Sequence, residues 1–87
     1  MLKDVKHVKP LEDYKVLVTF EDNKKVIYNA KNLLNKGEFR RLKNKELFQK
    51  SCKVMNNTLA FDIYGNNDVT QCFDIAPDML YKLPAFV

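Results

Sequence analysis

The sequence predicts a small α+β domain: a small antiparallel β-sheet, made of a meander of about three strands plus a second hairpin, with two or three short helices. Three observations lead to this prediction. Apolar and polar residues alternate in the first third of the chain, that rhythm changes at Ala30, and turn-forming residues separate the later apolar runs. With 87 residues, 46% of them hydrophobic, the chain is expected to form a single domain over residues 1–87.

The first thirty residues predict a meander of three strands. Residues 3–9 alternate imperfectly and end at Pro10, which fits the end or edge of a strand because it cannot donate to a ladder. Residues 14–21 are the clearest strand. Four apolar side chains fall on one face, Tyr14, Val16, Val18 and Phe20, and the other face holds Lys15, Leu17, Thr19 and Glu21. The turn pair Asp22-Asn23 then returns the chain as a third strand over residues 25–28.

Short helical segments follow the meander. One or two turns of helix are expected around residues 30–35, stopping near Gly37. Asn44 is a good N-cap for a helix of about residues 44–50, because its side chain accepts hydrogen bonds from the first turn. Leu47 and Phe48 are expected to pack inward from that helix.

A second hairpin and a loop come next. Residues 52–55 and 58–63 are expected to pair around Asn56-Asn57, because asparagine tolerates the backbone angles of a tight turn. Residues 64–70 favour a loop. The stretch DIYGNND, residues 62–68, superficially suggests a calcium loop, but it lacks the required spacing and the closing Glu, so we interpret it as a turn.

The stretch QCFDIAPDMLY, residues 71–81, admits a structural and a chemical interpretation. In the structural one, a last strand leads to a helix or 3-10 turn at Pro77, and the Asp78 carboxylate accepts backbone N–H bonds in its first turn and complements the helix dipole. Met79, Leu80 and Tyr81 then cover the open end of the core. In the chemical one, two carboxylates act as acid and base or as metal ligands. We favour the structural clasp, because no histidine lies nearby in the sequence. The residues assigned to it are Asp74, Pro77, Asp78, Leu80 and Tyr81.

The order of these pieces resembles a known family. V-x-x-V-K-P is followed by DYKVLVTFEDNK, then by NLL, GEF and L-x-x-x-x-LF, and after the hairpin by G-N-x-D and DIAPDMLY. Over about residues 3–81 this order is similar to the small bacterial domain-of-unknown-function 2442 family. The chain departs from the pattern of many members at Asn23, where they have Gly, and at Phe61, where they have Trp.

The resemblance implies a small α+β domain with no established activity. Members occur alone or beside a DNA-binding helix-turn-helix, which this chain is too short to carry. Some are encoded next to another small protein in arrangements that resemble toxin–antitoxin pairs. The partner that the resemblance suggests is therefore a small protein from an adjacent gene, with this chain as the binding, antitoxin-like half.

We expect no enzymatic activity, no cofactor and no metal site. The two glycines are too few for a phosphate-binding loop, and two cysteines with one histidine fall short of the four ligands of zinc. A cysteine nucleophile paired with His7 is the enzymatic alternative, but nothing in the sequence brings the two together. Cys52 and Cys72 are instead expected to be reduced, buried strand residues.

The bulk charge and the start of the chain indicate a cytoplasmic protein with a basic first half. Residues 1–50 hold thirteen Lys or Arg against seven Asp or Glu, whereas residues 51–87 hold two against four. The start, MLKDVKHVKP, lacks the apolar segment of a signal peptide. No apolar run approaches the roughly 20 residues of a membrane helix, so no membrane contact is expected.

The candidate interaction surface is the basic segment, residues 36–50. It carries the candidate contact residues Lys36, Arg40, Arg41, Lys43 and Lys45. The segment admits three interpretations: a solvated face over a core of Phe39, Leu42, Leu47 and Phe48, a docking face for an acidic protein, or a nucleic-acid surface on which Phe39 and Phe48 stack bases. The first is the commonest for such segments. As a function we favour a protein-interaction module that uses this segment and a sheet edge, with a nucleic-acid-binding accessory domain as the alternative.

Overall fold

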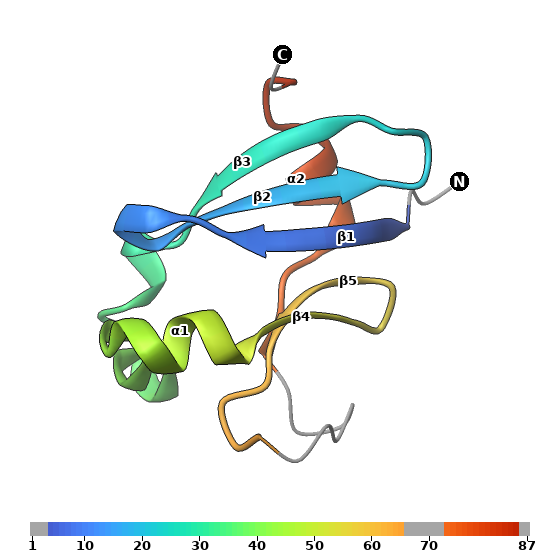
Figure 1. Ribbon diagram of the computed structural model, residues 1–87. Coiled ribbons are helices and arrows are strands. Elements are labelled where there is room, and N and C mark those ends of the chain that lie inside the picture. The colour runs from blue at the N-terminus through green and yellow to red at the C-terminus, as the bar shows by residue number, and fades with distance from the viewer. Residues whose placement is uncertain (1–3, 66–72, 86–87) are drawn as a thin grey trace.

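The computed structural model describes residues 4–65 and 73–85, and in these residues the chain forms two three-stranded antiparallel sheets (Figure 1). The first sheet holds, in order, β1 (Val5–Pro10), β2 (Lys15–Phe20) and β3 (Lys25–Asn29). The second holds β4 (Cys52–Met55), β5 (Thr58–Phe61) and β6 (Phe73–Asp74). The helices are α1 (Lys45–Ser51), α2 (Pro77–Tyr81) and the 3-10 segments η1 (Glu12–Tyr14), η2 (Lys31–Leu33) and η3 (Gly37–Lys43). The α+β prediction is confirmed, and the second hairpin forms a sheet of its own with β6.

The alternation in β2 decides which face of the first sheet is buried. Val16, Val18 and Phe20 are fully buried, whereas the residues between them are only half-buried. In the register of the sheet Val18 lies opposite Val26, which is also fully buried. The predicted inner face is therefore confirmed, although Tyr14 falls just before β2, in η1.

Both edges of the first sheet contact other parts of the chain. At β1, the Val5 amide donates a hydrogen bond of 2.9 Å to the Asn57 carbonyl, and β1 contacts both β4 and β5. At β3, Val26 forms an isolated bridge with Ala85. Pro10 ends β1 on the edge of the sheet, as predicted. A strand added by a partner would meet these contacts at either edge of the first sheet, and the use of a sheet edge for docking stays a prediction.

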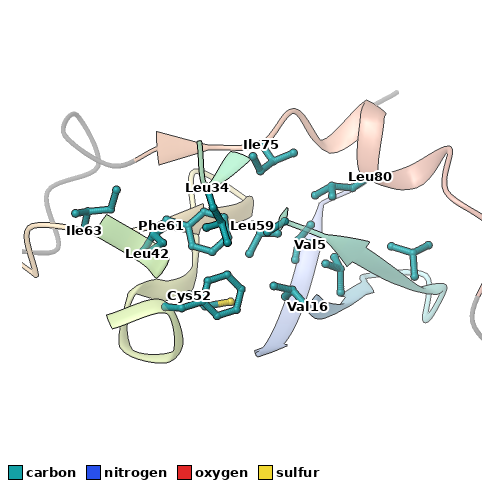
Figure 2. Packing of buried hydrophobic residues seen from close by; sticks show 14 of the residues in the cluster. Val5, Val16, Leu34, Leu42, Cys52, Leu59, Phe61, Ile63, Ile75 and Leu80 are labelled. Carbon is teal, nitrogen blue, oxygen red and sulfur yellow. The ribbon is translucent and has the colours of Figure 1, made fainter. Parts of the chain in front are cut away.

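The core lies between the two sheets and α2. Figure 2 shows Val5 and Val16 of the first sheet, Leu59 and Phe61 of the second, and Leu80 of α2 within one cluster. Burial of such a side chain stabilises the fold by about 1.5–3 kcal/mol. Because the cluster draws on elements from both ends of the sequence, neither sheet has a core of its own.

Asn44 caps α1 as predicted. Its Oδ1 accepts hydrogen bonds from the backbone N–H groups of Glu46 (3.0 Å) and Leu47 (3.3 Å), two of the four donors that a helix start leaves free. Phe48 is buried and Leu47 is half-buried against the core, which confirms their inward packing. The η3 segment before this cap was not predicted, because a 3-10 turn lacks the 3.6-residue period that reveals an α-helix.

Asparagines form both hairpin turns, as predicted. Asn23 lies in the left-handed region between β2 and β3 with a φ of 72°, and Asn56 and Asn57 do so between β4 and β5 with φ of 54° and 62°. This region is costly for most side chains and is tolerated best by Gly, Asn and Asp. The asparagine at position 23 therefore serves where many members of the resembled family have Gly.

Some expectations fall outside the described residues. The loop predicted over residues 64–70 is described only at Tyr64 and Gly65. The last three residues of the DIYGNND stretch, 66–68, lie outside the described residues. The predicted burial of Cys72 also lies outside them.

Candidate interaction surface

The η3 segment turns its apolar residues inward and its cations outward. A 3-10 helix has three residues per turn, so Phe39 and Leu42 lie on the same side. Leu42 is fully buried, and the Phe39 ring meets Phe61 edge-on, with 6.2 Å between ring centroids. Arg40 and Arg41 lie between them and are both exposed. The core therefore holds the backbone of η3 while leaving the two guanidinium groups at the surface.

All five predicted contact residues are exposed and follow one another along a short stretch of surface. Lys36 occupies the N-cap position of η3, Arg40, Arg41 and Lys43 lie on η3, and Lys45 begins α1. The hydroxyl of Tyr14 donates a hydrogen bond to the Lys43 carbonyl, which ties the end of η3 to η1. The basic segment is thus a fixed backbone that presents several cations to solvent.

The two phenylalanine rings that the nucleic-acid interpretation needs for base stacking, Phe39 and Phe48, pack in the core or against it. Phe48 is only 2% exposed and meets Tyr14 edge-on at 5.4 Å, and Phe39 packs on Phe61 and Phe73. Phe48 is therefore unavailable for stacking on a base, whereas Phe39 is half-buried and turns toward the core. The exposed aromatic beside the basic segment is Tyr64, 49% exposed, with the Arg41 guanidinium 5.8 Å from its ring centroid. The sequence gave no signal for this pair, because Tyr64 lies more than twenty positions from Arg41.

A hollow of about 520 Å³ opens at the Lys45 end of the basic segment. It lies between η1 and α1, and its lining residues are Leu11, Glu12, Asp13, Tyr14, Lys45, Phe48 and Gln49. Apolar side chains and groups of both charges thus meet in one concave site. A hollow of this mixed character suits an anchoring side chain of a protein better than a phosphate, which Glu12 and Asp13 would repel.

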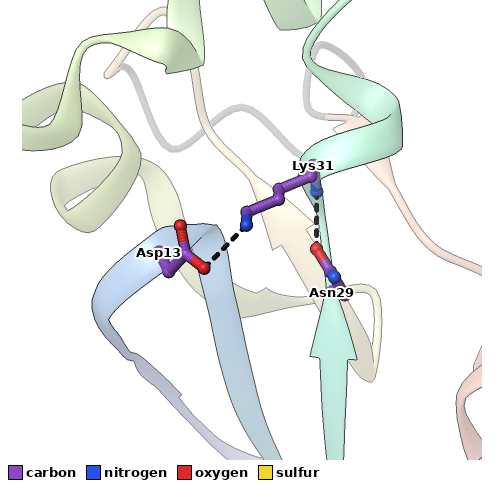
Figure 3. Close-up of polar contacts among 3 residues, drawn as sticks. All are labelled: Asp13, Asn29 and Lys31. Atoms are coloured by element: carbon purple, nitrogen blue, oxygen red, sulfur yellow. Dashed lines mark hydrogen bonds and ion pairs between the residues drawn. The ribbon is translucent and has the colours of Figure 1, made fainter.

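The η1 wall of the hollow has an unusual backbone that several contacts hold in place. Asp13 and Tyr14 both lie in the left-handed region, with φ of 62° and 61°. The Lys31 ammonium donates to Asp13 Oδ2 at 2.6 Å, and the Lys31 amide donates to Asn29 Oδ1 at 3.0 Å (Figure 3). The hydrogen bond from Lys31 lowers the pKa of the Asp13 carboxyl below its usual value. Strained residues of this kind persist only where the surroundings fix them, and they are frequent at binding sites.

The C-terminal stretch packs in and against the core, and its assignment as a structural clasp stays a prediction. Leu80 is fully buried, Pro77 begins α2, and the Tyr81 ring meets Phe20 edge-on at 4.9 Å. Asp74 lies exposed at the end of β6, where Asn56 donates to it at 3.4 Å, and Asp78 lies exposed in the first turn of α2.

Two details of the clasp differ from the prediction. Met79 was expected to cover the core, but its side chain is 60% exposed, because the neighbouring Leu80 takes the inward position on this short helix. The start of α2 at Ala76 has no side-chain cap hydrogen bond, so Asp78 contributes through its position near the helix dipole.

Of the side chains considered for catalysis or metal binding, Cys52 and Asp62 are buried and His7 is exposed. Burial raises the pKa of the Cys52 thiol to about 12, so it holds almost no reactive thiolate at neutral pH. His7 is an exposed residue of β1. The buried Asp62 carboxylate accepts a hydrogen bond of 3.1 Å from Lys53, and its backbone amide donates to the Ser51 carbonyl at 2.9 Å. Lys53 and Asp62 thus form an ion pair that secures the second sheet.

Within residues 4–65 and 73–85, no three His, Cys, Asp or Glu side chains gather in an arrangement suited to a metal ion. In the same part of the chain, no helix is both long and apolar enough to span a membrane.

The fold is that of a small α+β domain in which two three-stranded sheets share one core. The chain belongs to family DUF2442, described as a protein of unknown function, whose model matches residues 5–84. This confirms the family resemblance over nearly the whole chain. No curated protein and no solved structure matches the chain.

Proposed function

We propose that this chain is a protein-interaction module that binds an acidic protein partner in the cytoplasm through its basic segment. The observation that carries the proposal is the arrangement of η3, where half-buried Phe39 and fully buried Leu42 hold the backbone while Arg40, Arg41 and Lys43 face solvent. A surface that is already ordered loses little conformational entropy on binding. Its cations would also speed the encounter with an acidic partner.

The hollow beside Lys45 supports a protein partner. Binding energy at protein interfaces concentrates in a few side chains that fill pockets, surrounded by charged residues that set orientation. The hollow offers Tyr14 and Phe48 as apolar walls for such an anchor, and Lys45 joins it to the basic segment. This arrangement suits the binding half of a two-protein system, which is the role that the gene arrangements of some family members suggest. The chemistry of this chain would then be binding rather than catalysis.

Affinity capture with charge variants tests this function. The tagged protein is used to capture partners from its native cell after nuclease treatment, and bound proteins are identified by mass spectrometry. We expect one stoichiometric protein, and we expect Arg40→Glu with Arg41→Glu to abolish its capture while the fold survives. Lys6→Glu with Lys82→Glu is the matched control, because it changes the net charge equally at two exposed residues outside the basic segment. Retained capture by the folded arginine variant would contradict the proposal.

The second candidate is a nucleic-acid-binding accessory domain, and the Arg41–Tyr64 pair is the observation that favours it. An exposed ring beside a guanidinium is a suitable platform for a single-stranded base. This function predicts that labelled single-stranded DNA or RNA binds, that affinity falls steeply with salt, and that Tyr64→Ala weakens binding. No detectable binding at low salt would exclude it.

A further inference from the structure

The outer face of the first sheet is uncovered and partly apolar. Leu17 and Ile27 lie opposite each other on β2 and β3, and both are half-buried. Neither belongs to the core cluster or to the hydrophobic residues packed against it. α2 covers the other face, where Leu80 enters the core, and no described element lies over the Leu17–Ile27 face (Figure 1).

Cations surround this apolar pair on the same face. The register places Lys9 beside Leu17 in one row, and His7, Thr19 and Lys25 form the next row. Lys15 lies two residues from Leu17 on β2, so it shares that face. β1, β2 and β3 contain no Asp or Glu. In the sequence, acidic residues adjoin the strands only beyond their ends, at Asp4, Glu12, Asp13, Glu21 and Asp22. We call this surface the lysine face and define it by Lys9, Lys15, Leu17, Lys25 and Ile27.

We propose that the lysine face is a second docking surface, which binds an acidic polypeptide segment carrying aliphatic side chains between its carboxylates. Leu17 and Ile27 would be covered by the aliphatic groups, and the three lysines would meet the carboxylates. Burying apolar surface of this kind favours binding, and charge complementarity fixes orientation and raises the association rate.

The chemistry of the face selects this occupant over two others. A second copy of the chain would bring three lysines against three lysines, which is repulsive. A nucleic acid would find cations but no aromatic ring among the five residues of the face on which to stack a base. The proposal goes beyond the function proposed above, since the lysine face and the basic segment share no residue.

Nuclear magnetic resonance with a defined probe tests the proposal. The probe is a synthetic peptide in which two leucines are flanked on both sides by glutamates, titrated into the ¹⁵N-labelled full chain. We expect the largest amide shift changes at Leu17, Thr19, Lys25 and Ile27. A peptide with serines in place of the leucines, and one with glutamines in place of the glutamates, should each bind at least about tenfold more weakly, a loss of about 1.4 kcal/mol.

Two variants decide whether the face itself is responsible. Leu17→Thr with Ile27→Thr keeps residues that favour strands and should weaken peptide binding about tenfold or more. Lys9→Gln with Lys25→Gln should do the same without touching the apolar pair, so the test stands even if the threonine variant does not fold. Lys50→Gln with Lys82→Gln removes equal charge at two exposed residues outside the lysine face and outside the five candidate contact residues, and it should leave peptide affinity unchanged.

Three results would overturn the proposal: no shift changes, changes confined to residues 36–51, or unaltered binding by a folded lysine-face variant. The arginine variant of the preceding subsection separates the two surfaces. If it loses its cellular partner but still binds the peptide, both surfaces act independently.

Discussion

The Tyr81 hydroxyl donates a hydrogen bond of 2.6 Å to the Asp22 carboxylate, which joins α2 to the turn between β2 and β3. The contact has two further parts. The Lys24 ammonium lies 4.1 Å from the centroid of the Tyr81 ring and donates a hydrogen bond of 2.5 Å to the Tyr81 carbonyl. A cation, a ring and a carboxylate thus hold the C-terminal clasp against the first sheet.

This contact predicts a loss of stability at alkaline pH. The hydrogen bond to Asp22 is the main cause that raises the pKa of Tyr81 above its usual value of 10.0. Folding therefore favours the protonated phenol, and the stabilisation is complete below the pKa of the unfolded chain, at a pH of about 10. It is lost as the pH rises from there through the higher pKa of the folded state. Urea unfolding at a series of pH values should show this decline.

Tyr81→Phe is the variant that isolates the hydroxyl, because it keeps the ring on Phe20. The decline above pH 10 should become shallower, but it should not vanish, because burial also raises the pKa of Tyr28. If the variant and the parent chain lose stability with the same slope, the Tyr81 hydroxyl does not contribute to the linkage.

Neighbouring residues of α2 should respond very differently to truncation. Leu80→Ala empties a fully buried position and should reduce the free energy of unfolding by about 2–5 kcal/mol. Met79→Ala is the matched control, since the Met79 side chain is 60% exposed and its loss should change stability by less than about 0.5 kcal/mol. Equal effects in denaturant melts would mean that α2 does not pack on the core as described.

The Cys52 thiol should resist alkylation while the protein is folded. Its pKa of about 12 and its burial leave little thiolate for iodoacetamide at pH 8. In a Cys72→Ser background, mass spectrometry should show slow modification of the native protein and rapid modification in urea. Rapid labelling of the native protein would show that the thiol is accessible, and the cysteine would then return as a candidate nucleophile.

Much of the fold could be predicted because local signals agree with the tertiary structure. The alternating burial of β2, the asparagine turns and the Asn44 cap each depend on a few adjacent residues, and all appear where predicted. The exposure of Arg40 and Arg41 followed in part from their adjacency, since neighbouring side chains cannot both face the core.

Other features depend on contacts between distant residues, which a local pattern does not record. The hollow forms because η1 and α1 meet, and the unusual φ angles of Asp13 and Tyr14 come from the contacts that hold η1. The third strand of the second sheet likewise depends on β6 pairing with β5, from which a long segment separates it in the sequence. The exposure of Met79 was missed because a helix of five residues is too short for its period to show which side chain turns inward.

The bridge between Val26 and Ala85, together with the burial of Leu80, has a consequence for biosynthesis. The meander is translated well before the residues that close its edge and cover Phe20. A nascent chain that ends before residue 80 therefore presents an unfinished sheet with uncovered apolar side chains, which is the kind of surface that chaperones bind and that promotes aggregation. Cooperative folding of this domain must accordingly wait until almost all of the described chain has left the ribosome.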